Sequence, residues 1–227
     1  MVKFAIDGKW FKIPQRLTPE EWSGLARLDL REPLVWPKAL SQITGAPLAD
    51  LQDADPKGLE LGMGFVMNLL QSRKRTAEHL NFGEITFGQW VDLDIWLVWG
   101  VDVHLTDILG ILAPQCKWAD EGMYIVEQYA KWRLSVYKSY SALFGLDEPQ
   151  GDEEDTGDKM AVARGWYAVM VKLAQGDILK LDPIAEQPLK KALNMLAYQK
   201  QQELEERAQA LEIKRKYDLQ RNSRSFR

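Results

Sequence analysis

The sequence predicts a mainly α-helical protein with an N-terminal β-hairpin packed on a multi-helix domain and a long C-terminal helix projecting from it. Helix start signals recur along the chain, either as a cap followed by proline or as Thr with Glu or Gln three residues later. Apolar residues between these signals recur at spacings of three and four. The C-terminal segment is rich in Gln, Glu, Ala and Lys, which favour helix, and poor in apolar residues.

The first sixteen residues are expected to form the hairpin. Asp7-Gly8 is a dipeptide that tolerates the positive φ angles of a type I′ turn. Pairing the residues outward from this turn places one group on a single face, namely Val2, Phe4, Ile6, Phe11 and Ile13. The opposite face carries Lys3, Trp10 and Lys12. Because an isolated hairpin is marginal in water, the apolar face should pack on the helices that follow.

The next helices are expected at Thr18 to about Leu28, Trp36–Ile43, Leu48–Gln52, Asp55 to about Arg73, Thr86 to Trp99, and Val103–Leu112. Gly62 and Gly64 interrupt the fourth of these helices, which indicates close packing or a kink. The Thr86–Trp99 helix is apolar on most sides and should be largely buried.

A longer helix is expected from Trp118 to Phe144, ended by Gly145. Residues spaced by three and four form one stripe on a single face of this helix. The stripe consists of Trp118, Gly122, Ile125, Tyr129, Trp132, Val136, Tyr140 and Leu143. A stripe of this breadth is typical of a core helix.

An acidic segment follows at 146–158, with seven carboxylates, no basic residue, two glycines and a proline, and it is interpreted as a flexible loop. Its Asp152-x-Glu154-x-Thr156-Gly157 resembles a calcium loop, but the twelfth position is Ala163 where a Glu is needed. Helix resumes at Lys159–Ala174, and a final helix begins at Asp182-Pro183 or at Pro188 and runs to about Asn222.

These expectations divide the chain into five parts: the hairpin at 1–16, a helical core at 17–145, the acidic loop at 146–158, a helical continuation of the core at 159–198, and a projecting helix with a basic tail at 199–227.

Composition restricts the function classes. A net charge of -4 and a pI near 5.4 argue against a general nucleic-acid coat protein. One cysteine and two histidines cannot form an internal disulfide or the common Cys/His zinc site. The start of the chain shows no signal-peptide pattern, and no stretch reaches the length of a membrane span. We therefore expect a cytoplasmic protein without metal or other cofactor.

The candidate catalytic groups each have a simpler structural interpretation. Asp92 and Asp94 are two residues apart on a helix and point about 200° apart, so they cannot form an acid/base pair by themselves. His104 and Asp107 share a helix face, as a core-edge pair would. Cys116 has no identifiable base. Since the common phosphate, dinucleotide, hydrolase and zincin motifs are also missing from the sequence, we expect no enzyme.

The C-terminal helix is the candidate partner-binding element. Its apolar stripe is strong at Leu189, Leu193 and Leu196 but beyond Tyr198 thins to four residues, Leu204, Ala208, Leu211 and Tyr217. Basic residues accompany them at Lys214, Arg215, Lys216 and Arg221. A solitary helix of this length is marginal without a partner surface. We expect it to bind another protein or a second copy, and the basic tail to meet an acidic surface, the acidic loop or nucleic acid.

Several phrases resemble bacteriophage tail assembly chaperones. Besides the hairpin they are KIPQRLTPEEWSGLARLD, ITGAPLADL, NFGEITFGQWVDLDIWL, ILAPQCKWADEGMYIVEQYAKWRLSVYKSYSALFGL and PLKKALNMLAYQKQQELEE. The resemblance covers most of the chain and lies in element order and Trp-rich phrases. It implies a non-enzymatic protein of the infected cell's cytoplasm that holds the helical tape-measure protein while tail-tube subunits polymerise around it.

Two alternatives stay open at this point. A structural virion component, such as a neck, capsid-lining or baseplate protein, would use the same C-terminal helix as a fixed contact between subunits. An enzyme or host-inhibiting factor would need Asp92, His104 and Asp107 to converge in a pocket with perturbed pKa values.

Overall fold

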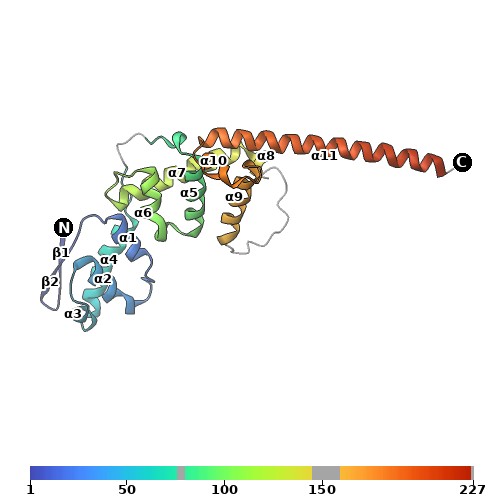
Figure 1. Cartoon of the computed structure of the whole chain (residues 1–227). Helices are drawn as coiled ribbons and strands as arrows, with labels where there is room; N and C mark the ends of the chain where they lie inside the picture. Colours follow the sequence, from blue (N-terminus) through green and yellow to red (C-terminus); the bar gives the residue numbers. More distant parts are fainter. Residues whose placement is uncertain (76–79, 145–158, 226–227) are drawn as a thin grey trace. The chain divides into compact units, whose positions relative to one another are not determined.

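The computed structural model describes residues 1–75, 80–144 and 159–225, with the side chains of the last helix as far as Tyr217. It is mainly α-helical, as predicted, with an N-terminal hairpin and a long C-terminal helix (Figure 1). The predicted acidic loop at 146–158, including the calcium-like sequence, lies outside the described residues, as does Arg227.

The described residues cluster into two compact units. The first contains 1–75, 80–82, 91–132 and 159–163, and the second contains 83–90, 133–144 and 164–225. Helices α5 (Phe87–Trp99), α7 (Ala119–Ser139) and α9 (Lys159–Leu173) each contribute residues to both units. The five-part division at 1–16, 17–145, 146–158, 159–198 and 199–227 stays a prediction.

The hairpin of the first unit is confirmed in its register. Strand β1 (Val2–Ile6) pairs antiparallel with β2 (Lys9–Ile13), with Val2 opposite Ile13 and Phe4 opposite Phe11. Asp7 and Gly8 in the turn have φ angles of 48° and 77°, the left-handed region that this turn type requires. The predicted inner face is buried at Phe4, Ile6, Phe11 and Ile13, whereas Trp10 on the outer face is exposed.

Helices complete the first unit around this hairpin. They are α1 (Pro19–Ala26), η1 (Pro33–Val35), α2 (Trp36–Thr44), α3 (Leu48–Gln52), α4 (Pro56–Gln71) and α6 (Val101–Leu112). The capping box that begins α1 is confirmed, since Thr18 N–H donates to Glu21 Oε2 at 2.8 Å and Glu21 N–H donates to Thr18 Oγ1 at 3.2 Å. α1 packs on α6, while α2 packs on α3, α4 and β2.

The two glycines predicted to interrupt α4, Gly62 and Gly64, have different surroundings. A Cβ on Gly62 would lie 2.9 Å from Phe4 Cε2 and 3.0 Å from Leu40 Cδ2, whereas one on Gly64 would meet open space. Gly62 therefore allows the hairpin and α2 to approach α4 closely. Of these two positions, the predicted close packing is confirmed at Gly62; Gly58 of the same helix is also closely packed, since a Cβ there would lie 2.8 Å from Ile6 Cγ2.

The single helix predicted from Trp118 to Phe144 is instead two helices, α7 and the short α8 (Ser141–Phe144), separated at Tyr140. The Ser139 hydroxyl donates to Ser135 O at 2.9 Å, a local bond that competes with helical geometry. The predicted stripe is buried at Gly122, Ile125 and Tyr129, but Trp118 is exposed and the residues after Tyr129 are only half-buried.

The second unit is built around the start of the last helix. Its remaining elements are η3 (Ile178–Lys180), α10 (Leu181–Ala185) and α11 (Leu189–Ser225), and η2 (Phe82–Glu84) crosses into it. Of the two predicted starts, Pro188 is the one that precedes α11, and the Asp182-Pro183 sequence forms α10. Phe87 N–H donates to Gln187 O at 2.8 Å and Leu189 N–H donates to Ile85 O at 3.2 Å, which ties α11 to the start of α5.

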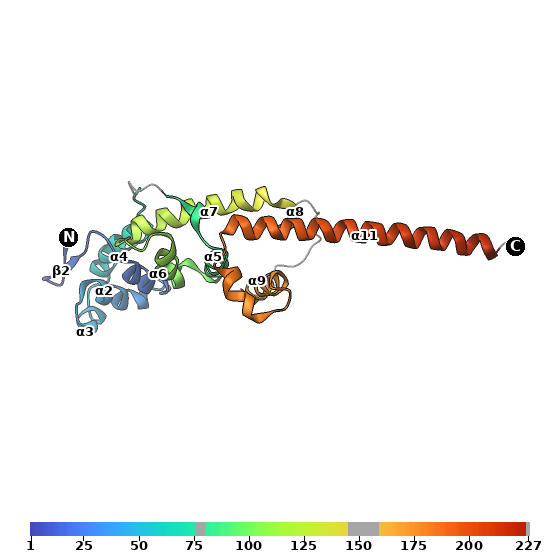
Figure 2. The same cartoon turned by 45° about the horizontal axis from the view of Figure 1, so that its top comes forward.

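Aromatic rings form the core of the second unit. Phe87 meets Trp166 edge-on with ring centroids 5.9 Å apart, and Phe144 meets the same tryptophan at 6.2 Å. Tyr137 bridges Phe144 and Trp90, at 4.2 Å and 5.8 Å. The Tyr140 hydroxyl donates to Asn194 Oδ1 at 2.7 Å, and α8 runs beside α11 (Figure 2). The hydrogen bond to Asn194 and the contact with α8 hold the first turns of α11 in this unit.

Candidate partner-binding surface

The second half of α11 is uncovered. Leu189, Leu193 and Leu196 are buried, but every described side chain from Leu204 to Tyr217 is exposed. Figure 1 shows this part of α11 extending beyond α8, α9 and α10. We call residues 199–225 of α11 the arm. The predicted partner-binding residues all lie on it.

Three of those residues form one stripe. Leu204, Ala208 and Leu211 are spaced by four and three residues, which places them on one helix face, and the two leucines are 54% and 61% exposed. Tyr217, 71% exposed, follows Leu211 by six residues and therefore lies on another face. It shares that face with Ile213, 67% exposed, which the sequence analysis missed although the spacing of four would have revealed it.

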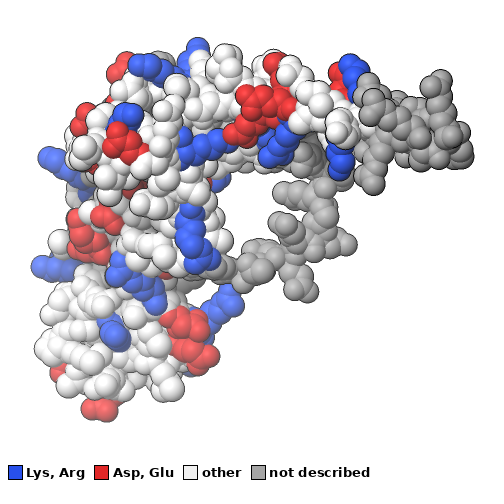
Figure 3. All heavy atoms as spheres, turned by 45° about the vertical axis from the view of Figure 1, so that its right-hand side comes forward, with Lys and Arg blue, Asp and Glu red and all other residues white. Residues whose placement is uncertain are grey.

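Three of the four predicted basic residues, Lys214, Arg215 and Lys216, are exposed on the same arm. Lys216 pairs with Glu212 one turn earlier at 2.8 Å, and the Lys214 and Arg215 side chains lie beside it in the sequence, also exposed. The side chain of Arg221 lies outside the described part of the chain. Figure 3 shows acidic and basic side chains intermixed along the described arm, so its surface is not uniformly basic.

The base of the arm is anchored by charge. Lys172 of α9 pairs with Glu203 at 2.6 Å, and Lys200 Nζ donates to Leu143 O at 3.4 Å. The hydrogen bond from Lys172 holds the pKa of Glu203 below its usual value, helped by the charges of Lys172, Arg207 and Lys200. This cluster does not follow from the sequence pattern of α11, because Lys172 lies on a different helix.

An open pocket of about 270 Å³ lies at this anchor point. Its apolar lining comes from Leu143, Val169, Leu196 and Leu204, and its charged lining from Lys172, Lys200, Glu203 and Arg207. Leu204 is thus the point where the buried stripe of α11 becomes the exposed one.

The candidate catalytic carboxylates of α5 point apart, as the spacing predicts. Asp94 is buried and Asp92 lies on the exposed side. Partial desolvation of the Asp92 carboxyl raises its pKa. The two carboxylates do not converge on a common point of the first unit.

His104 and Asp107 of α6 do meet. His104 Nδ1 and Asp107 Oδ2 are 3.0 Å apart, and the imidazole stacks on Trp96 with an interplanar angle of 15° and a centroid distance of 5.9 Å. Trp99 contacts the same ring at 5.8 Å. The histidine is therefore packed between aromatic rings at the edge of the core, with its carboxylate partner on the surface side.

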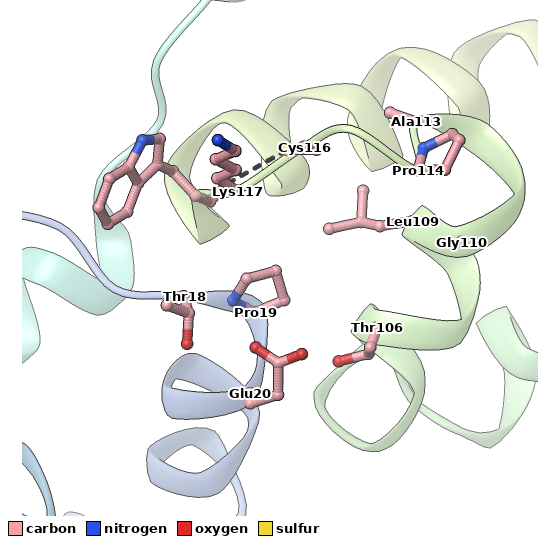
Figure 4. A pocket seen from close by; sticks show the side chains of 11 residues that line it. Thr18, Pro19, Glu20, Thr106, Leu109, Gly110, Ala113, Pro114, Cys116 and Lys117 are labelled. Carbon is pink, nitrogen blue, oxygen red and sulfur yellow. Dashed lines mark hydrogen bonds between the residues drawn. The ribbon is translucent and has the colours of Figure 1, made fainter.

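Cys116 lines an open pocket of about 540 Å³ in the first unit, between the start of α1, the end of α6 and the connection into α7 (Figure 4). Its thiol donates to Trp118 O at 3.4 Å. The pocket's other ionisable groups are Glu20 and Lys117. The thiol is therefore directed at a backbone carbonyl.

The remaining features to consider are a metal site and a membrane-spanning helix. Within residues 1–75, 80–144 and 159–225, His, Cys, Asp and Glu side chains form no group of three that could hold a metal ion. Among the helices that the structure describes, none combines the length and apolar character needed to cross a membrane.

Comparison of the chain with protein-family models, curated proteins and solved structures found no match.

Proposed function

We propose that the protein is a non-enzymatic phage assembly protein, and that it acts as a tail assembly chaperone that holds the tape-measure protein in the infected cell's cytoplasm during tail-tube formation. The tape-measure protein is long and helical, so the surface that holds it must accept an amphipathic helix. The uncovered stripe of the arm is the observation that carries this proposal.

Leu193 and Leu211 show why the stripe fits a helix. They are 18 residues apart, about five turns of an α-helix, so they point in nearly the same direction around the axis of α11. Leu193 is 1% exposed, whereas Leu211 is 61% exposed. A client helix laid along Leu204, Ala208 and Leu211 would continue the same packing, and the small side chain of Ala208 leaves room for close approach.

Co-expression with the tape-measure protein of the same phage tests this proposal. The wild-type chain should keep the tape-measure protein soluble and co-purify with it. The variant Leu211→Asp should lose both effects, because it places a charge in the apolar contact. Leu34→Asp is the matched control, since Leu34 is also exposed but lies in the first unit. Equal capture by all three proteins would contradict the proposal.

Mass spectrometry of purified particles separates this function from the second candidate. The arm carries acidic and basic side chains on its surface, which also favours a permanent contact between subunits of a neck, capsid-lining or baseplate protein. A chaperone should be missing from finished particles. Stoichiometric presence in them would replace the chaperone function with the structural one.

A further inference from the structure

The arm follows a seven-residue repeat that the contacts at its anchor do not explain. Gln201, Leu204, Ala208, Leu211 and Arg215 are spaced alternately by three and four residues. This is the a and d spacing of a two-stranded coiled coil, with both leucines at d. We call this stripe the seam. Its side chains from Leu204 onward are exposed, so the seam is uncovered in the single chain.

Charges of opposite sign flank this seam. The g positions, on one edge, are Lys200, Arg207 and Lys214, all basic. The e positions on the other edge include Glu205 and Glu212, both acidic and exposed. In coiled coils these two edges select the partner and its orientation.

We propose that the arm pairs with the arm of a second copy of this chain, parallel and in register. In that arrangement the basic edge of each helix lies against the acidic edge of the other. Lys200 then faces Glu205 of the second copy, and Arg207 faces its Glu212. Each of these contacts occurs twice, because the pair is symmetric. An antiparallel pair would place basic edge against basic edge, which is unfavourable.

The intrachain contacts of the two acidic groups are easily exchanged. Glu205 accepts a hydrogen bond from Gln201 at 3.0 Å, and Glu212 pairs with Lys216, both along the exposed surface of the same helix. Surface interactions of this kind contribute little to stability. Exchanging them for contacts across an interface therefore costs little free energy.

The seam predicts a weak, reversible dimer. Two leucines supply the apolar core, Ala208 allows close approach, and Gln201 and Arg215 place polar groups at a positions, which fixes register at a cost in stability. Ile213 and Tyr217 lie off this seam and stay exposed in the pair. The inference goes beyond the proposed function, because pairing requires no client.

Sedimentation equilibrium of the purified full chain, without tape-measure protein, tests the pairing. The wild type should associate to a dimer as its concentration rises. The variant Glu205→Lys/Glu212→Lys makes both edges basic, and Lys200→Glu/Arg207→Glu makes both acidic. Each variant alone should dimerise with an affinity about tenfold or more below that of the wild type. An equimolar mixture of the two should form heterodimers. Glu60→Lys/Glu206→Lys is the control, with the same change in net charge away from both edges.

A cysteine cross-link tests the orientation. In a Cys116→Ser background, Leu211→Cys should form a homodimeric disulfide under oxidising conditions, since a parallel in-register pair places the two copies of position 211 side by side. A protein that stays monomeric at all concentrations, a dimer indifferent to the charge variants, or a missing cross-link would each overturn the inference. Loss of tape-measure capture with dimerisation intact would instead count against the proposed function alone.

Discussion

Two leucines at equivalent angular positions of α11 have opposite surroundings, and this contrast is the most informative one at the scale of single residues. Leu193 is almost fully buried, while Leu211 is mostly exposed. Both residues are leucines with the same helix propensity. Any difference in the effect of replacing them therefore reports their surroundings.

The substitution Leu193→Ala should lower the free energy of unfolding by about 2–5 kcal/mol, since it removes buried methyl groups and leaves a cavity. Leu211→Ala should change it by less than about 0.5 kcal/mol in dilute protein, because the side chain has no cover there. Urea denaturation at low protein concentration measures both. A comparable loss in the two variants would mean that the arm is covered within its own chain.

Gly62 and Gly64 of α4 give a second test at this scale. Gly64→Ala should raise the free energy of unfolding by about 0.5–1 kcal/mol, because alanine restricts the unfolded chain and its Cβ meets open space. Gly62→Ala should lower it by about 1–3 kcal/mol, because its Cβ would press on Phe4 and Leu40. Thermal and urea unfolding of the two variants measure the difference, and the same sign in both would contradict the packing described for Gly62.

The ion pair of Glu203 with Lys172 predicts a pH dependence. The pKa of Glu203 is lowered from 4.5 in the folded protein, so the pair stabilises the fold above pH 4.5. This contribution is lost as the pH falls through the lower, folded-state pKa. The thermal midpoint of Glu203→Gln should therefore lie below that of the wild type at pH 7, and the two should converge in strong acid. Glu60→Gln, on the surface of α4, is the control, and a constant difference across the pH range would exclude the pair as its cause.

At the scale of elements, local signals predicted most starts of helices correctly. The capping boxes at Thr18 and Thr86 act within four residues, and both are present, the second with Gln89 N–H donating to Thr86 Oγ1 at 3.2 Å. The break at Tyr140 was missed, because a stripe spaced by three and four continues through a short interruption. The start of α11 stayed undecided because it depends on hydrogen bonds of Gln187 and Leu189 to Phe87 and Ile85, which are distant from them in the sequence.

The candidate partner-binding surface was predictable in part, because its stripe is a local pattern. The stripe at Leu204, Ala208 and Leu211 follows from spacing alone, and the heptad with its charged edges could also have been found there. The anchor of the arm could not, since Lys172 and Leu143 reach it through the tertiary fold.

Truncation tests where the arm detaches from its unit. A chain ending at Arg207 keeps the contacts of Lys200, Glu203 and Leu204, so its thermal midpoint in dilute solution should stay close to that of the full chain. A chain ending at Tyr198 loses those contacts and should melt at a lower temperature. Circular dichroism follows both melts. Equal destabilisation by the two truncations would place stabilising contacts beyond Arg207.

At the scale of the whole molecule, the division into two units was not visible in the sequence. Residues 83–90 join 133–144 and 164–225 through the aromatic contacts of Phe87, Trp90, Tyr137 and Trp166. Aromatic spacing indicates that a helix is buried, but it does not say which helices share a core. Only the arm, whose side chains from Leu204 to Tyr217 are exposed, could be assigned a surface role from its own pattern.

Hydrogen exchange along the whole chain connects the packing with the proposed pairing. Amides of α5 and of the first half of α7 should exchange slowly, because they open only with large parts of the fold. Amides of the arm beyond Arg207 should exchange fastest among the helical residues in dilute protein, because no tertiary contact of a described side chain protects them. Raising the protein concentration should slow exchange in the arm and leave α5 and α7 unchanged, since pairing orders the arm alone. The variant Glu205→Lys/Glu212→Lys should show fast arm exchange at both concentrations. If concentration slowed exchange throughout the molecule, the copies would meet through another surface, and if the arm were protected in dilute protein, the helix would be stable without a partner.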